Sequence, residues 1–132
     1  MQLTARPGFF GAKNAFMPGI LINFNGGIPM VTKIVNNDTA AVFAEDIALI
    51  DFSATWCGPC TMVAPVVESL SEKFAGRIAF YNCDVDDNME LASKFGIQNI
   101  PALVVLKKGA IADTKVGFMP EPILEQWLNG LV

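Results

Sequence analysis

A nearly continuous apolar run over residues 47–54 (IALIDFSA) is the feature that most limits how this chain can fold. Strands that are apolar on both faces are typical of sheets covered by helices on both sides. The run is followed by apolar residues with the spacing of one helix face: Val63, Val66, Val67, Leu70 and Phe74. A buried strand followed directly by an amphipathic helix indicates an α/β fold.

The same alternation continues along the chain. We expect further strands over residues 32–35, 77–85, 102–106 and 110–116, the last two joined as a hairpin. Further helices are expected from Asp38 or Thr39 to Glu45, from Asp87 (with Glu90 completing a capping motif) to Gly96, and from Pro122 onward. The apolar stripe of the last helix is Ile123, Leu124, Trp127, Leu128 and Leu131. The expected fold class is α/β, with a mixed sheet flanked by helices on both faces.

Composition excludes several classes of function. The 132 residues suit one domain, and nine basic against 13 acidic residues give a net charge of −4, whereas nucleic-acid binding needs a basic face. Since the chain has no histidine, imidazole metal sites and histidine-based catalysis are ruled out. The uncharged stretch 14–32 is interrupted by proline, glycine and asparagine, so we expect neither a membrane span nor a secretory signal.

Residues 1–29 differ from the rest of the chain. They hold five glycines and three prolines, no acidic residue, and neither helical nor strand periodicity. We therefore expect a flexible N-terminal extension or a mis-assigned start, with Met30 as an alternative start, and a folded domain over residues 30–132.

Cys57 and Cys60 are spaced C-x-x-C where the apolar run passes into the helix, so they can close a small disulfide ring. Free N–H groups and the macrodipole at a helix N-terminus favour a thiolate on Cys57, which can attack a partner's disulfide. Cys60 then resolves the mixed disulfide. Gly58 allows close approach of a substrate backbone, and Pro59 fixes the turn, so both should tune the redox chemistry.

Two simpler interpretations of the pair remain open. Structural zinc needs four ligands, and only Cys83 is left to add, so we expect no metal. A purely structural disulfide is the other alternative. Cys83 itself is expected to be a buried, inert thiol, with regulation by oxidation as the alternative.

The segment DFSATWCGPC, residues 51–60, resembles the active-site signature of the thioredoxin family. Ile100-Pro101 resembles the cis-proline loop of that family, and Lys115-Val116-Gly117 resembles its glycine near the end of the last strand. The resemblance covers residues 31–132. It implies four to five strands with four helices, a dithiol that reduces protein disulfides without a bound cofactor, and electrons from NADPH through a flavoprotein thioredoxin reductase.

The resemblance also implies roles for individual residues. Asp51 would be a buried acid beneath the cysteines that shuttles the Cys60 proton; the alternative is an exposed carboxylate at a strand edge. Pro101 would follow a cis peptide bond that faces the disulfide; the alternative is a trans proline that starts a strand. An uncharged patch would dock substrates, and it comprises Trp56, Gly58, Pro59, Ile100, Pro101, Gly117 and Phe118. Core packing of Trp56 or Ile100 is the alternative.

Three residues depart from the family pattern. Ser53 stands where many members have tryptophan or another bulky side chain, and Asn82 and Thr61 stand where lysine is common. Loss of those cations affects how readily Asp51 and Cys57 ionise, so the redox potential is open. The sequence therefore predicts a monomeric cytoplasmic reductase of disulfide-containing proteins. The alternatives are a non-catalytic docking subunit of the same fold and an exported thiol oxidant or isomerase.

Overall fold

The computed structural model describes residues 30–132, so the expected extension over residues 1–29 lies outside the described residues. The elements in chain order are β2 (Val31–Lys33), α1 (Ala40–Ala44), β3 (Ile47–Ser53), α2 (Gly58–Lys73), β4 (Ala79–Asp84), α3 (Met89–Lys94), β5 (Ala102–Lys107), β6 (Ala110–Val116) and α4 (Glu121–Leu131). Each predicted strand and helix of this region is present, with ends that differ by a residue or two.

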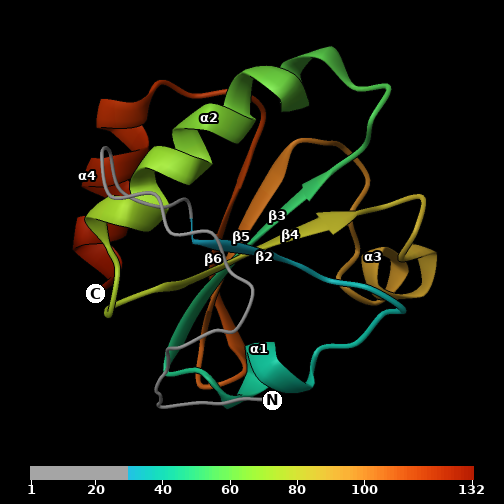
Figure 1. Ribbon diagram of the computed structural model, residues 1–132, viewed down its shortest axis with the longest axis horizontal. Helices are drawn as coiled ribbons and strands as arrows, with labels where there is room; N and C mark the ends of the chain where they lie inside the picture. The colour runs from blue at the N-terminus through green and yellow to red at the C-terminus, as the bar shows by residue number, and fades with distance from the viewer. Residues whose placement is uncertain (1–29) are drawn as a thin grey trace, which may run out of the picture.

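The described strands form one mixed sheet in the order β2-β4-β3-β5-β6. Strand β4 runs parallel to β2 and β3, whereas β5 runs antiparallel to β3 and β6. Figure 1 shows α2 and α4 together on one side of the sheet and α1 and α3 on the other. The predicted α/β class with a mixed, doubly covered sheet is confirmed. Strand β3 lies at its centre and is buried from Ala48 through Phe52.

The pleat of β3 divides the core into two layers. Ile50 and Phe52 pack with side chains of α1 and α3, whereas Leu49 packs with Val63 of α2 and with α4. Because side chains alternate along a strand, Asp51 faces the layer of α2 and α4. The sheet therefore directs this carboxyl group toward the helix that begins at the cysteines.

The start of α3 differs from the sequence-based expectation. Asn88, not Asp87, is the N-cap residue, and the predicted capping motif is wrong. The buried Asn88 amide donates to the carbonyl oxygens of Ile34 at 3.1 Å and Asp84 at 3.0 Å, and its Oδ1 accepts from the N–H of Asn37 at 2.8 Å. Asn88 is therefore fixed by backbone groups of the loop after β2 and of the last residue of β4 rather than by a local capping bond.

The last helix also buries fewer residues than its pattern suggests. Leu124 and Leu128 are buried, but Ile123 is 50% exposed and contributes no core contact. Trp127 is half-buried at the edge of the core, where its Nε1 donates to Asp113 Oδ2 at 2.8 Å. Leu131 is also half-buried and packs against the same core, so Ile123 is the one stripe residue that lies at the surface.

Candidate active site

Cys57 and Cys60 form a disulfide across the first turn of α2, with their Cα atoms 5.3 Å apart. Cys57 is the N-cap residue, and its Sγ accepts a hydrogen bond from the backbone N–H of Cys60 at 3.2 Å. Gly58 and Pro59 lie between them at exposed positions, where the missing N–H of proline removes no helical hydrogen bond. After reduction, the free N–H groups and macrodipole at this helix end stabilise a thiolate on Cys57.

A loop from a distant part of the chain closes over the disulfide. The peptide bond between Ile100 and Pro101 is cis, as expected, and the carbonyl oxygen of Ile100 lies 3.9 Å from Cys57 Sγ. This is a contact in the disulfide form, and a Cys57 thiol can donate to the same oxygen. The end of β6 joins the loop, because the N–H of Gly117 donates to the Pro101 carbonyl at 2.8 Å. Gly117 has a φ of +94°, which glycine adopts readily.

Two large apolar side chains near this loop are exposed. Trp56, directly before Cys57, is 69% exposed, and Phe118, directly after Gly117, is 41% exposed. Core packing of Trp56 is therefore wrong, whereas Ile100 is half-buried and packs against both the disulfide and the core layer of α1 and α3. Pro101 is buried, so it shapes the loop from within. The docking role of these residues stays a prediction.

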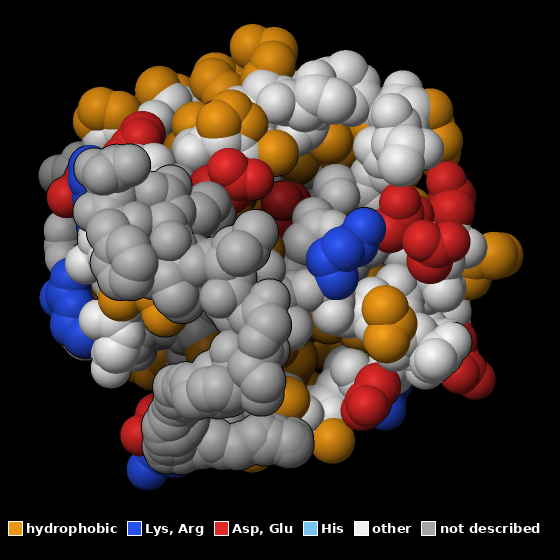
Figure 2. All heavy atoms as spheres, viewed as in Figure 1, with side chains coloured by type: hydrophobic (Ala, Val, Ile, Leu, Met, Phe, Trp, Pro, Cys, Tyr) orange, Lys and Arg blue, Asp and Glu red, His pale blue; other side chains and the backbone are white. Residues whose placement is uncertain are grey.

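Trp56 is held by an acidic loop that the sequence analysis did not single out. Its Nε1 donates to Asp86 Oδ2 at 2.7 Å. Asp86 and Asp87 lie between β4 and α3, directly after Asp84 at the end of β4, and Figure 2 shows acidic side chains gathered at that end of the molecule. The sequence alone does not predict this hydrogen bond, because Trp56 and Asp86 are 30 residues apart in the chain and Asp86 is one of three neighbouring aspartates.

Asp51 is 3% exposed, so an exposed strand-edge carboxylate is excluded. Its Oδ2 accepts a hydrogen bond from Asn82 Nδ2 at 3.4 Å, and its Oδ1 has no partner among the described residues. Burial raises the pKa of Asp51 to about 6, against a smaller opposing effect of the Asn82 hydrogen bond. A carboxyl group that titrates near neutral pH is suited to exchange protons with a thiol.

Cys83 is a free, buried thiol in β4. Burial raises the pKa of this thiol to about 12, so it stays protonated and unreactive at neutral pH. In the described region 30–132, no three side chains of His, Cys, Asp or Glu are grouped so that they could hold a metal ion. No helix of that region has the length and apolar character needed to cross a membrane.

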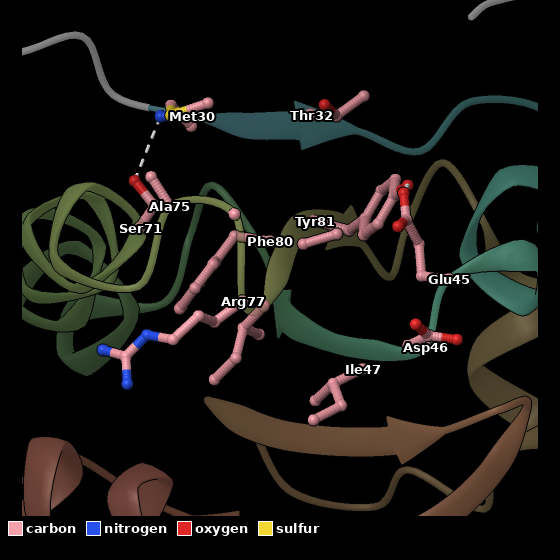
Figure 3. A pocket seen from close by; sticks show the side chains of 13 residues that line it. Met30, Thr32, Glu45, Asp46, Ile47, Ser71, Ala75, Arg77, Phe80 and Tyr81 are labelled. Atoms are coloured by element: carbon pink, nitrogen blue, oxygen red, sulfur yellow. Dashed lines mark hydrogen bonds between the residues drawn. The ribbon is translucent and has the colours of Figure 1, made fainter. Parts of the chain in front are cut away.

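A cavity of about 600 Å³, whose lining is shown in Figure 3, lies at the end of the sheet opposite to the disulfide. Its lining includes Ile47 and Ala79, the first residues of β3 and β4, whereas the cysteines follow the last residue of β3. At its rim the N–H of Met30 donates to Ser71 Oγ at 3.0 Å. This half-open cavity therefore does not mark the redox centre.

Comparison with known proteins agrees with this geometry. The family model described as thioredoxin matches residues 30–130. Thioredoxin of Bacillus subtilis (strain 168) is 40% identical over 99 residues, which cover 75% of this chain and 95% of that protein. Thioredoxin of Haemophilus influenzae is 42% identical over 92 residues, 70% of this chain and 86% of that protein. The chain therefore belongs to the thioredoxin family, and it is a thiol–disulfide oxidoreductase.

Proposed function

We propose that Cys57 and Cys60 reduce disulfides of target proteins in two exchange steps. The Cys57 thiolate attacks one sulfur of the target disulfide, forms an intermolecular disulfide and releases the other target sulfur as a thiolate, which takes a proton from solvent. Cys60 then attacks Cys57 Sγ, closes the Cys57–Cys60 bond and releases the second target thiolate. The target gains two electrons and two protons, and the dithiol becomes the disulfide.

The second step needs a base, because Cys60 must lose its proton before it attacks. We assign this role to Asp51, whose carboxyl group faces the α2 layer and has a pKa near 6. The ionised carboxylate accepts the Cys60 proton, directly or through water, and passes it to solvent after the disulfide has closed. General-base assistance of this kind contributes about 10²- to 10⁴-fold to a rate.

The observation that carries the proposal is the redox pair at the N-terminus of α2, with the Ile100 carbonyl 3.9 Å from Cys57 Sγ. The exposed Trp56 and Phe118 supply an apolar surface against which an extended target segment can lie. We further propose that the disulfide is returned to the dithiol by NADPH through a flavoprotein thioredoxin reductase. The reducing cytoplasm is the compartment in which that cycle operates.

Replacement of single cysteines tests the order of the steps. With a target disulfide, Cys57→Ser should give no adduct and no turnover, whereas Cys60→Ser should accumulate a covalent adduct on Cys57. Intact-protein and peptide mass spectrometry identify the linked cysteine. Cys83→Ser is the matched control and should turn over at the unaltered rate. An adduct on Cys60 of the Cys57→Ser protein would reverse the assignment.

A further inference from the structure

One side-chain amide links the polar groups beneath the redox pair. Asn82 on β4 lies next to Asp51 on β3 in the parallel register. Its Nδ2 donates to Ser53 Oγ at 3.0 Å, to the Asp51 carbonyl oxygen at 3.3 Å and to Asp51 Oδ2 at 3.4 Å. Two of the residues that depart from the family pattern, Ser53 and Asn82, are therefore bonded to each other, and Asn82 is also bonded to the candidate base.

The three acceptors compete for the amide. An asparagine side chain offers two hydrogens, so three acceptors cannot each receive a full hydrogen bond. The serine hydroxyl is the closest of the three, and the Asp51 carboxylate oxygen is the farthest. Hydrogen bonds weaken with distance, so the carboxylate receives the weakest share of the donor.

From this competition we infer that Asn82 is a positioning residue that holds the Asp51 carboxyl group, and that Ser53 limits how strongly Asn82 donates to it. The inference deepens the proposed function, because it concerns the group to which we assign the Cys60 proton. At the position where lysine is common in the family, Asp51 therefore has a neutral neighbour, Asn82. The hydroxyl group of Ser53 sets how strongly this amide donates to the carboxylate.

Within residues 30–132, the other elements packed around Asp51 supply no compensating charge. On β5 its register partner is Leu103, and α2 contributes Val63 and the disulfide-bonded Cys60 to this side of the sheet. Cys83 on β4 alternates to the opposite face and remains protonated. The salt bridges of the described residues all belong to Lys73 near the end of α2.

Asp84 is the next residue of β4 on the face of Asn82. Its Oδ1 instead accepts from the backbone N–H groups of Asp86 and Asp87, at 2.8 and 3.3 Å. Asp84 is the one acidic residue of β4. The neutral amide is therefore the one side-chain donor to Asp51 among the described residues.

Two substitutions should move the titration of Asp51 in opposite directions. Asn82→Leu keeps the shape but removes the donor, so the carboxylate is less stabilised and its titration midpoint should rise by about half a pH unit. Ser53→Ala removes the competing acceptor, so the amide donates more fully and the midpoint should fall by a similar amount. In the double variant the serine has no amide to compete for, so its midpoint should match that of Asn82→Leu alone.

The experiment follows the ¹³C signal of the Asp51 carboxyl carbon between pH 4 and pH 9 in the oxidised full-length protein. The disulfide form is chosen because neither redox cysteine then titrates and couples to the carboxyl group. Asn129→Leu, the same exchange at an exposed position of α4, is the matched control and should leave the midpoint unchanged. Ser53→Ala keeps the test decisive if Asn82→Leu folds poorly.

Opposite shifts, with the double variant equal to Asn82→Leu, would support the inference. Shifts of the same sign, no shift in Ser53→Ala, or additive shifts in the double variant would overturn it. The pH dependence of mixed-disulfide resolution is then measured on the same variants in the Cys57–target adduct. If the carboxyl titration moves as expected while the resolution rate does not follow it, the positioning role stands and the base assigned under the proposed function is wrong.

Discussion

The indole of Trp56 and the carboxylate of Asp86 join two loops that meet at the redox centre, through a hydrogen bond of 2.7 Å. Trp56 is nevertheless 69% exposed, so its ring is fixed at one edge while most of its surface remains open to a partner. An aromatic side chain ordered before binding loses less conformational entropy when a target docks. We therefore expect the aspartate to contribute to recognition without touching the target.

Asp86→Ala should weaken docking of protein targets while leaving the chemistry intact. We expect KM for a protein disulfide to rise about 3- to 10-fold, as for the cost of immobilising one large side chain, with kcat and the reduction of a small aromatic disulfide unchanged. Insulin reduction and small-disulfide reduction, each at several concentrations, measure the two effects.

Asp113→Ala is the matched control for this change. It releases Trp127 from an equivalent hydrogen bond of 2.8 Å on the outer strand β6, away from the cysteines. Its kinetics with both substrates should equal those of the unaltered protein. Equal KM increases in the two variants would mean that the Asp86 effect is a general loss of order rather than a docking effect.

The fold and the redox pair could be predicted because their signals are local. The apolar run of β3, the helical spacing in α2 and the C-x-x-C motif each lie within a few residues of one another. The hydrogen bonds that hold the site are not local: Asn82 and Ser53 are 29 residues apart, and Asn88 and Ile34 are 54 apart. A single sequence does not predict such pairs, because a polar residue that bonds to a distant partner has the same local sequence pattern as one that is exposed to solvent.

The last helix shows the same limit for packing. Its stripe correctly identified Leu124 and Leu128, but Ile123 has the same apolar character and lies at the surface. Periodicity gives the face of a helix, whereas the depth of each position depends on which neighbours the sheet order brings to it.

Burial on α4 predicts very different costs for two similar substitutions. Leu128→Ala removes a side chain with 0% exposure and should lower the free energy of unfolding by about 2–5 kcal/mol. Ile123→Ala, at 50% exposure, should change it by less than about 1 kcal/mol. Urea unfolding of both variants at one pH gives the comparison. Similar losses for the two would contradict the placement of Ile123 at the surface.

A chain that starts at Met30 should keep both fold and activity. The described residues 30–132 contain the sheet, the two core layers and the redox pair, and Met30 is held by Ser71 Oγ. We expect the melting temperature to change by less than about 5 °C, equivalent to about 1 kcal/mol for a domain of this size. Thermal melts and insulin reduction of the shortened and full chains measure this. A larger loss would show that residues 1–29 contribute to stability.

Asp51→Asn should make the protein more stable at neutral pH, and the sign follows from linkage. The folded-state pKa of Asp51 is raised from 3.8 to about 6, so the native state binds more protons than the unfolded state in that window. Stability of the unaltered protein therefore falls as pH rises from 3.8 to about 6 and stays lower above it. A shift of this size corresponds to a cost of roughly 3 kcal/mol.

Since asparagine does not titrate, the gain in stability of Asp51→Asn over the unaltered protein should grow between pH 4 and pH 7 and then level off. The same change removes the acceptor for the Cys60 proton, so resolution of the mixed disulfide at pH 7 should slow by about 10²-fold or more. Formation of the adduct by Cys57 should keep its rate. Urea unfolding at pH 4, 7 and 9 measures the first effect, and rapid-quench mass spectrometry measures the second. A pH-independent stability difference would contradict the raised pKa, and resolution at the unaltered rate would contradict the role of Asp51 as base.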